Sequence, residues 1–494
     1  MKRVGFDNEM YLRLQSEHIR ERIDQFGGKL YLEFGGKLFD DYHAARVLPG
    51  FSPDSKIQML LELREQAEIV VVINAADIEK NKVRGDLGIT YDLDVLRLID
   101  AFRAFDLYVG GVVITQYSEQ YAARQFRARL EELGIRVYLH HPIVGYPSDI
   151  PLIVSPEGFG KNDYIETTRP LVVVTAPGPA SGKMSTCLSQ LYHDDLRGIR
   201  SGYAKFETFP VWNLPLRHPV NLAYEAATAD LDDVNMIDPF HLDAYGLTTI
   251  NYNRDIEVFP VLQAIFQRIW GQCPYKSPTD MGVNMVGKCI SDDQVVEQAA
   301  KQEIIRRYYA AMCARHQGLG EQDVVLKIEL LMNRADTSPA GRPVIAAAVA
   351  RAEQAEVPAA AIEMPDGTLI SGKWSALLNA PAAMILNALK YLAGIDDAAL
   401  LISPTVIEPV QELKSELLDN PDSRLHTEET LIALAICAVT DPAARAALDQ
   451  LPKLSGCEVH STVILSQGDE GVFRKLGMNL TCEPKYQTRR LYHR

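Results

Sequence analysis

The residues best suited to chemistry lie at Gly178–Ser185, in a turn of small residues that contains one lysine. A β-branched run, Leu171–Thr175, precedes the turn, and a helical pattern follows it. A strand, a turn and a helix in this order leave the first helical N–H groups unpaired at the positive end of the helix dipole. Lys183 adds a full positive charge. We therefore expect a phosphate-binding turn formed by Gly178, Ser181, Gly182, Lys183, Met184, Ser185 and Thr186.

The turn is a variant of the P-loop pattern G-x-x-x-x-G-K-[ST]. Pro177 occupies the first glycine position, and Met184 replaces the hydroxyl residue that reaches magnesium in a P-loop. Ser185 is one residue further along, where a helical side chain points about 100° away. The sequence therefore predicts binding of a phosphate-bearing ligand, does not assure magnesium, and predicts weak or absent magnesium-dependent ATP hydrolysis. The alternative is a Gly- and Pro-rich turn with a solvated lysine.

Two other glycine-punctuated loops contain candidate catalytic residues. Lys37 and His43 follow the strand-like run Lys29–Phe34, and ligands collect at the carboxyl ends of parallel strands. Asp280 lies in the loop Thr279–Asn284. We expect Lys37, His43 or Asp280 to lie near Lys183 and share one ligand. The alternatives are a solvated turn for the first loop and a local cap for the second.

No metal site is predicted. The cluster of Asp230, Asp232, Asp233, Asp238 and His241 has ligand-type residues, but a solvated acidic loop is favoured. The seven cysteines are scattered and form no C-x-x-C pair, which is neither a disulfide framework nor a zinc ribbon.

Composition limits the partners. The 494 residues carry a formal net charge of −15, from 65 acidic and 50 basic residues, so the surface repels nucleic acid and anionic membranes. No apolar stretch is long enough to span a bilayer, and charge near the N-terminus argues against a signal peptide. We expect a cytoplasmic protein whose partner is a small-molecule anion, and homo-oligomerisation is left open.

The hydrophobic pattern predicts an α/β fold with a mostly parallel sheet and flanking helices, Rossmann-like or P-loop-like. Strand-like runs alternate with helical ones through the first 250 or so residues. Long helices follow, and then a second alternating region in which Val324–Leu331 is predicted to be a strand. We therefore expect an α/β domain at 1–255 that holds the phosphate turn, a helical domain at 256–322 and a C-terminal α/β domain at 323–494.

Long motifs resemble a known family. Gly158–Pro170, Ala176–Lys183 and Thr186–His193 are similar to a bacterial family of conserved hypothetical proteins, uncharacterised protein family 0371. Lys276–Met285 and Leu32–Leu38 look similar too, so the resemblance extends over nearly the whole chain. It implies a bacterial protein, and some members carry the label ATP-dependent peptidase. This chain gives that label no support, because Ser181 lacks a G-x-S-x-G frame and H-E-x-x-H is absent from the sequence.

Three functions remain open from the sequence. The first is an enzyme acting on a phosphorylated or nucleotide-like small molecule, with the anion at Ser181–Ser185. The second is a non-catalytic nucleotide or metabolite sensor. The third is a structural protein in which the turn binds nothing.

Overall fold

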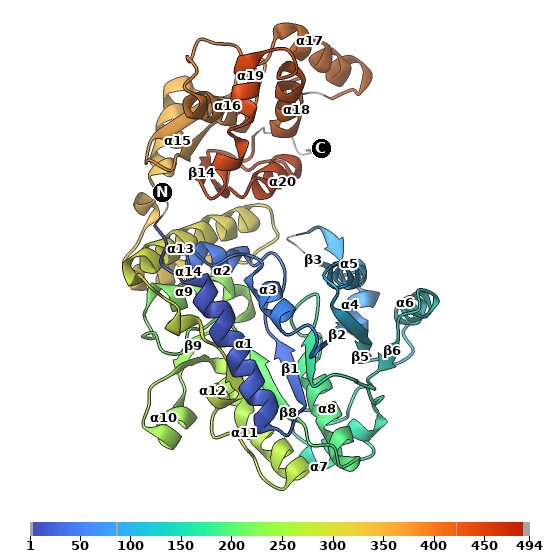
Figure 1. The fold of residues 1–494 in the computed structure, drawn as a ribbon. Coiled ribbons are helices and arrows are strands. Elements are labelled where there is room, and N and C mark those ends of the chain that lie inside the picture. The colour runs from blue at the N-terminus through green and yellow to red at the C-terminus, as the bar shows by residue number, and fades with distance from the viewer. Residues whose placement is uncertain (1–2, 85–86, 421, 488–494) are drawn as a thin grey trace. The chain divides into compact units, whose positions relative to one another are not determined.

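The protein is described here from a computed structural model that covers residues 3–84, 87–420 and 422–487 (Figure 1). Contacts group the chain into two compact units. The N-terminal unit comprises Val4–Glu225 and Asp232–Ala299. The C-terminal unit comprises Ala300–Arg494 together with Met1–Arg3 and Ala226–Leu231.

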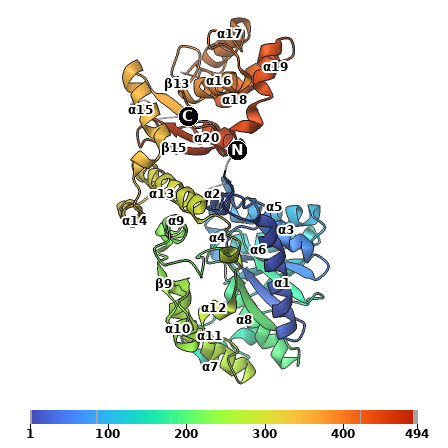
Figure 2. The ribbon, with the colours of Figure 1, turned by 60° about the vertical axis from the view of Figure 1, so that its left-hand side comes forward.

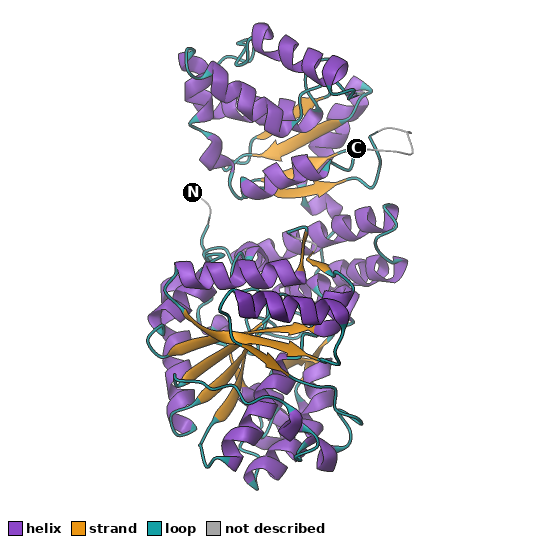
Figure 3. Ribbon diagram, turned by 90° about the vertical axis from the view of Figure 1, so that its right-hand side faces the viewer, coloured by secondary structure: helices purple, strands orange, loops and turns teal. Residues whose placement is uncertain are grey.

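A seven-stranded parallel sheet forms the centre of the N-terminal unit (Figure 3). Across the sheet the strands are β11 (Gly282–Val283), β8 (Gly202–Phe206), β1 (Leu30–Phe34), β7 (Leu171–Thr175), β2 (Ala67–Asn74), β5 (Tyr108–Thr115) and β6 (Val137–Leu139). Every pairing is parallel, so the predicted α/β class is confirmed. The chain leaves β2 towards β5 but leaves β7 in the opposite direction, towards β8. Open α/β sheets bind ligands at the carboxyl ends of strands beside such a reversal.

Helices cover both faces of this sheet. One apolar core joins the sheet to α7 (Ile150–Ile153), α8 (Lys183–Leu196) and α11 (Asn253–Trp270). On the other side α1 (Asn8–Gln25) packs against α3 (Ser55–Glu62), and α5 (Tyr91–Ala104) packs against β2 and β5 (Figure 2). Right-handed crossovers that run in opposite directions along a sheet place their helices on opposite faces, which accounts for the two layers.

The buried strands are β-branched because both of their faces are covered. β7 (LVVVT) is buried along its whole length, and β2 (AEIVVVIN) is buried except at its last residue. Such continuous apolar runs are typical of parallel strands between two helical layers. The same pattern in the sequence predicted β7.

Shorter elements complete the N-terminal part of the chain. These are α2 (Tyr42–Val47), α4 (Ala75–Glu79), α6 (Tyr121–Glu132), α9 (Pro219–Ala227), α10 (Pro239–Tyr245), α12 (Pro278–Met281) and the antiparallel pairs β3 (Val83–Arg84) with β4 (Ile89–Thr90) and β9 (Asn235–Ile237) with β10 (Ile250–Tyr252). Helix α13 (Asp293–His316) begins in the N-terminal unit and continues in the C-terminal unit.

The C-terminal unit has its own mixed sheet. Its strands are β13 (Leu369–Lys373), β12 (Ala359–Glu363), β14 (Glu458–Ser461) and β15 (Asn479–Cys482), in that order. Only the β14–β15 pairing is parallel among these described strands. The helices are α14 (Gln322–Arg334), α15 (Pro343–Ala355), α16 (Ala380–Ala393), α17 (Pro404–Glu412), α18 (Thr427–Cys437), α19 (Pro442–Leu448) and α20 (Gln467–Lys475).

One predicted element is wrong. The run Val324–Leu331 was expected to be a strand, but it belongs to helix α14. The buried residues of α14 are Val325, Ile328, Leu331 and Met332, which recur at helical spacing. The three-part domain division stays a prediction, while the contacts themselves group the chain into two units.

Candidate functional site

The turn between β7 and α8 is held in a fixed conformation by its neighbours. Gly182 is the N-cap of α8 and has a φ of 91°, a value that favours glycine. The Thr115 hydroxyl, at the end of β5, donates to the carbonyl of Ser181 at 2.6 Å. The Ser181 hydroxyl donates to the carbonyl of Gly178, also at 2.6 Å. Carbonyl oxygens of the turn are thus directed to internal partners.

The first turn of α8 leaves its N–H groups open. No side chain caps it, in contrast to α1 and α10, whose first turns are capped by Asp7 and Asp238. Thr186 N–H donates to the carbonyl of Gly182 at 2.9 Å, so the helical ladder begins there. Within the described chain, the backbone N–H groups of Lys183, Met184 and Ser185 donate to no protein acceptor. Three aligned donors at a positive helix end suit an oxyanion.

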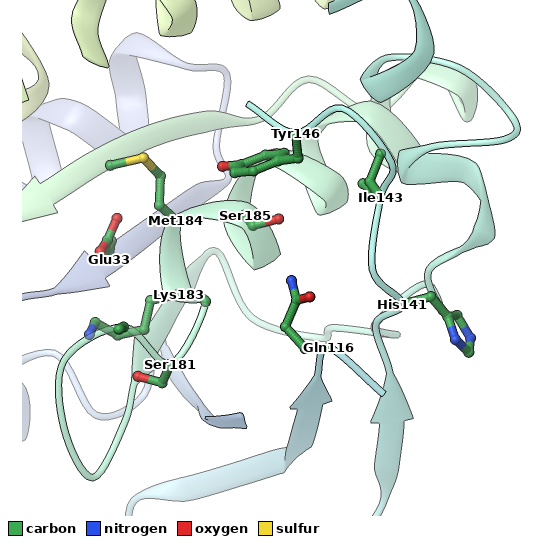
Figure 4. Close-up of a pocket in the computed structure, with 11 residues that line it drawn as sticks. Glu33, Gln116, His141, Ile143, Tyr146, Ser181, Lys183, Met184 and Ser185 are labelled. Carbon is green, nitrogen blue, oxygen red and sulfur yellow. The ribbon is translucent and has the colours of Figure 1, made fainter. Parts of the chain in front are cut away.

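These residues open into a pocket of about 280 Å³ (Figure 4). Its lining comprises Glu33, Gln116, His141, Ile143, Tyr146, Ala180, Ser181, Gly182, Lys183, Met184 and Ser185. Glu33 is the second-to-last residue of β1, Gln116 directly follows β5, and His141 lies two residues after β6. The pocket therefore lies at the carboxyl edge of the sheet, beside the reversal at β7.

Lys183 is a half-buried cation without a protein partner. Its ammonium makes no hydrogen bond or ion pair within the described residues. Burial lowers the pKa of Lys183, and the carboxylate of Glu33 acts against that effect by favouring the charged form. The nearby cation Lys205 lowers the pKa further. A bound anion would relieve this desolvation, because it supplies the missing opposite charge.

Glu33 supplies a buried carboxylate to the same pocket. It is only 8% exposed, and one oxygen, Oε2, accepts a hydrogen bond from Tyr203 at 2.7 Å. The other oxygen, Oε1, accepts none from the described residues. In Figure 4 Glu33 lies on the same side of the pocket as the Lys183 ammonium. The pocket thus combines the open N–H groups of the turn with a carboxylate oxygen that can accept further hydrogen bonds.

Tyr146 also lines the pocket, above the turn at the start of α8 (Figure 4). Its side chain interacts with that of Ser185, and in Figure 4 its hydroxyl end is directed towards Met184. Desolvation raises the pKa of Tyr146, and the charge of Glu33 raises it further. Tyr146 therefore stays a neutral phenol near pH 7.

A second polar cluster lies one strand away from Glu33. Lys205 on β8 is the cross-strand neighbour of Glu33. The Lys205 ammonium lies 2.8 Å from a Glu207 oxygen and also contacts Asp255 and the hydroxyl of Tyr252. Burial raises the pKa of Glu207 to about 7, and Asp255 adds to this effect while Lys205 opposes it. Glu207 is therefore easier to protonate than a solvated carboxylate.

The expected site residues are distributed unequally. Ser181, Gly182, Lys183, Met184 and Ser185 line the pocket, whereas Gly178 and Thr186 are not among its lining residues. Gly178 provides room for Tyr91, because a Cβ there would lie 2.2 Å from the Tyr91 hydroxyl. Thr186 is buried, with its hydroxyl 3.5 Å from His140 Nδ1.

The candidate catalytic residues are not brought into the pocket lining. Lys37 is exposed in the loop after β1, and the His43 ring packs edge-on against Phe209 at 5.3 Å. The Asp280 carboxylate accepts from Tyr245 and from the backbone of Lys276, both at 2.9 Å. Arg22 is in the last turn of α1, the helix that leads into β1, and it contacts the Asp280 carbonyl. Asp280 therefore lies towards the amino ends of the strands.

The acidic loop is built from structural contacts. Asp233 pairs with Arg254, and Asp238 caps α10 by accepting from His241 N–H at 3.0 Å. Among the described residues no group of three His, Cys, Asp or Glu side chains could hold a metal ion. Across all the residues that the structure describes, no helix is both long and apolar enough to cross a membrane.

Sequence reasoning missed Glu33, Gln116, His141, Ile143 and Tyr146 as pocket residues. Glu33 could have been found, because a carboxylate inside the apolar run KLYLEF is unusual for a buried strand. Gln116 directly follows β5 and His141 lies two residues after β6, so both are at carboxyl ends of strands. Nothing in the local pattern identifies Tyr146, since only the folded path from β6 to β7 brings it over the turn.

The fold and the pocket define an α/β protein with an open parallel sheet and a polar pocket at its carboxyl edge. Residues 4–336 match the family described as "Domain of unknown function DUF1846, N-terminal", and residues 340–492 match its C-terminal counterpart. The chain is 58% identical over its full length to UPF0371 protein stu1377 of Streptococcus thermophilus and to UPF0371 protein SpyM3_1021 of Streptococcus pyogenes, and it covers all of both relatives. The chain belongs to this family, and the resemblance in the sequence is confirmed.

Proposed function

We propose that the pocket binds the phosphate group of a small molecule at the first turn of α8. One observation carries the proposal: the uncapped N–H groups of Lys183, Met184 and Ser185 open into a pocket at the switch point of a parallel sheet. Helix N-termini at this place in α/β proteins are suited to phosphate. The unpaired Lys183 ammonium supports the same ligand, because charge-assisted hydrogen bonds to phosphate are among the strongest.

We propose that this binding needs no magnesium. The thioether of Met184 is a soft group that a hard cation does not choose. The Ser185 side chain interacts with that of Tyr146. The site thus lacks the hydroxyl arrangement that holds magnesium in a P-loop.

An enzyme is favoured over a sensor by the cluster around Lys205. Burial raises the pKa of Glu207 towards the range in which a general acid or base works. The cluster adjoins the pocket, because Glu33 lines the pocket and is the cross-strand neighbour of Lys205. In this proposal the ligand binds at Lys183 and proton transfer is carried out on the β8 side. Hydrolysis or transfer assays with phosphate esters separate an enzyme from a sensor. An enzyme should turn over an ester as wild type, and Glu207→Gln should lose this turnover while it still binds the ester.

Titration with inorganic phosphate tests the binding site. We expect wild-type protein to bind phosphate in calorimetry, and Lys183→Met to raise the Kd about 10-fold or more, since a hydrogen bond to a charged group contributes about 1.5–3 kcal/mol. Lys161→Met is the matched control, because Lys161 is an exposed lysine paired only with Glu157 on the surface. Affinity should be the same with magnesium and with a chelator.

Two results would contradict the proposal. One is equal phosphate affinity in wild type and Lys183→Met, or none in either. The other is an ATPase activity that requires magnesium and disappears in Ser185→Ala, which would restore a P-loop enzyme.

A further inference from the structure

We propose that the ligand is the phosphate ester of a small polyhydroxy compound, with one of its hydroxyl groups donating to Glu33. The inference rests on the proposed phosphate site and names the part of the ligand that extends beyond it. Three features of the pocket carry the inference: a buried acceptor, its charge environment and an apolar wall.

The buried acceptor is Glu33. With 8% of its surface exposed, it is more than nine-tenths buried, and its hydrogen-bond partner among the described residues, Tyr203, occupies only Oε2. A carboxylate has about four lone-pair sites, so Glu33 can accept further hydrogen bonds through Oε1. Because Glu33 lines the pocket, a ligand is the natural donor to Oε1.

The charge around Glu33 selects a neutral donor. Glu33 already interacts with two cations, Lys183 in the pocket and Lys205 on the neighbouring strand. A ligand ammonium would add a third positive charge beside these two, whereas a hydroxyl donates a hydrogen bond without one. A second phosphate next to Glu33 is disfavoured by repulsion between like charges. A hydroxyl therefore fits this position best.

The apolar wall suits the carbon skeleton of such a compound. Ile143, the Tyr146 ring and Met184 supply apolar surface to the lining, and in Figure 4 Met184 lies beside Glu33 while Ile143 lies across the pocket from it. Polyhydroxy rings and chains have C–H faces that pack on aromatic and aliphatic side chains while their hydroxyls bond polar groups. This arrangement also gives Met184 a role, since the position that departs from the P-loop pattern forms part of the wall.

The size of the pocket limits the ligand. Its volume of about 280 Å³ lies just below the roughly 300–1,000 Å³ of typical ligand pockets. A phosphorylated sugar or polyol fits this space better than a dinucleotide does.

A comparison of four phosphate compounds tests the inference on the full-length protein. Inorganic phosphate probes the turn alone, ethyl phosphate adds carbon without a further hydroxyl, and glycerol 3-phosphate and glucose 6-phosphate add hydroxyls. We expect wild type to bind at least one of the hydroxylated esters about 10-fold or more tightly than ethyl phosphate, the difference expected of one hydrogen bond to a carboxylate. Glu33→Gln should reduce this preference while inorganic phosphate binds as well as before or better, because a negative charge has been removed.

Two further variants keep the test decisive. Glu33→Asp retains the charge but shortens the reach, so the preference for hydroxylated esters should fall while the circular dichroism spectrum is unchanged. Glu65→Gln is the matched control, since Glu65 pairs with Arg64 on the surface before β2.

The outcomes separate this inference from the proposed function. If inorganic phosphate binds but the hydroxylated esters and ethyl phosphate bind equally well, the polyhydroxy ligand is ruled out and the phosphate site stands. If the preference survives unchanged in both Glu33 variants, Glu33 is not the acceptor and the inference fails. If no phosphate compound binds the wild type, the proposed function and this inference fall together.

Discussion

Gly182 is the residue on which the direction of the first turn of α8 depends. Its φ of 91° is a conformation that side chains rarely adopt, and a Cβ there would lie 3.0 Å from Cγ2 of Thr115. Thr115 also donates to the carbonyl next to it, at Ser181. Backbone conformation and close approach both require glycine, and together they direct the N–H groups of α8 into the pocket.

Gly182→Ala should weaken both the fold and the site. Forcing a side chain into the left-handed region costs about 1–2 kcal/mol, and the contact with Thr115 adds to that cost. The control is Gly134→Ala, because Gly134 also has a positive φ, 71°, but a Cβ there meets nothing within 4 Å. Denaturant unfolding should show a larger loss for Gly182→Ala than for Gly134→Ala. Only Gly182→Ala should also weaken phosphate binding, by about 10-fold. Equal losses in the two variants would show that the approach to Thr115 has no energetic effect.

At the scale of elements, strands of the parallel sheet were predictable and α14 was not. β2 and β7 are runs of Val, Ile and Leu that lie between two helical layers, so local composition and final environment agree. The start of α14 has the same β-branched composition, but its apolar residues recur at helical spacing and only one side is buried. The turn after β7 could be predicted because it depends on adjacent residues. The rest of the pocket could not, since its walls come from strands that are distant in sequence.

In the C-terminal unit, two helices are joined at their first turns by a charged pair. His426, the N-cap of α18, contacts Asp469 in the first turn of α20 at 2.8 Å, and Asp422 lies 3.7 Å from its other ring nitrogen. Asp469 also accepts from the backbone of Thr427 at 2.8 Å. Hydrogen bonds with Asp422 and Asp469 raise the pKa of His426 to about 9.

This pair should make the C-terminal unit less stable at alkaline pH. The folded state binds the His426 proton more tightly than the unfolded state does, whose pKa is about 6.5. The stabilisation is therefore complete below about pH 6.5 and is lost as pH rises towards 9. Since His426 is 27% exposed, solvent screening reduces the effect to about 2 kcal/mol. Denaturant unfolding between pH 6 and 9.5 should show a steeper decline in wild type than in His426→Gln, and parallel curves would contradict the role of the pair.

At the scale of the whole molecule, each unit has the elements of an independent fold. The N-terminal unit has the parallel sheet and the pocket, and the C-terminal unit has a separate mixed sheet with its own apolar core. Arg342 is a key residue of that second core: it is 1% exposed and bonds the carboxylate of Glu458, the Thr481 hydroxyl at 3.2 Å and the Val459 carbonyl at 3.1 Å. The two family matches also divide the chain, between residues 336 and 340.

Two separate cores should give two unfolding transitions, and a ligand should stabilise only the one that contains its site. We expect calorimetry to resolve two transitions and phosphate at 100 times its Kd to stabilise the N-terminal unit by about 2.7 kcal/mol, because the ligand binds only the folded state. Arg342→Met should lower the other transition, since removing one partner of a buried ion pair costs about 3–5 kcal/mol. The phosphate-induced shift should persist in Arg342→Met and disappear in Lys183→Met, which assigns each transition to its unit. If phosphate instead raised both transitions together, the units would unfold as one cooperative structure and binding at α8 would be coupled to the second core.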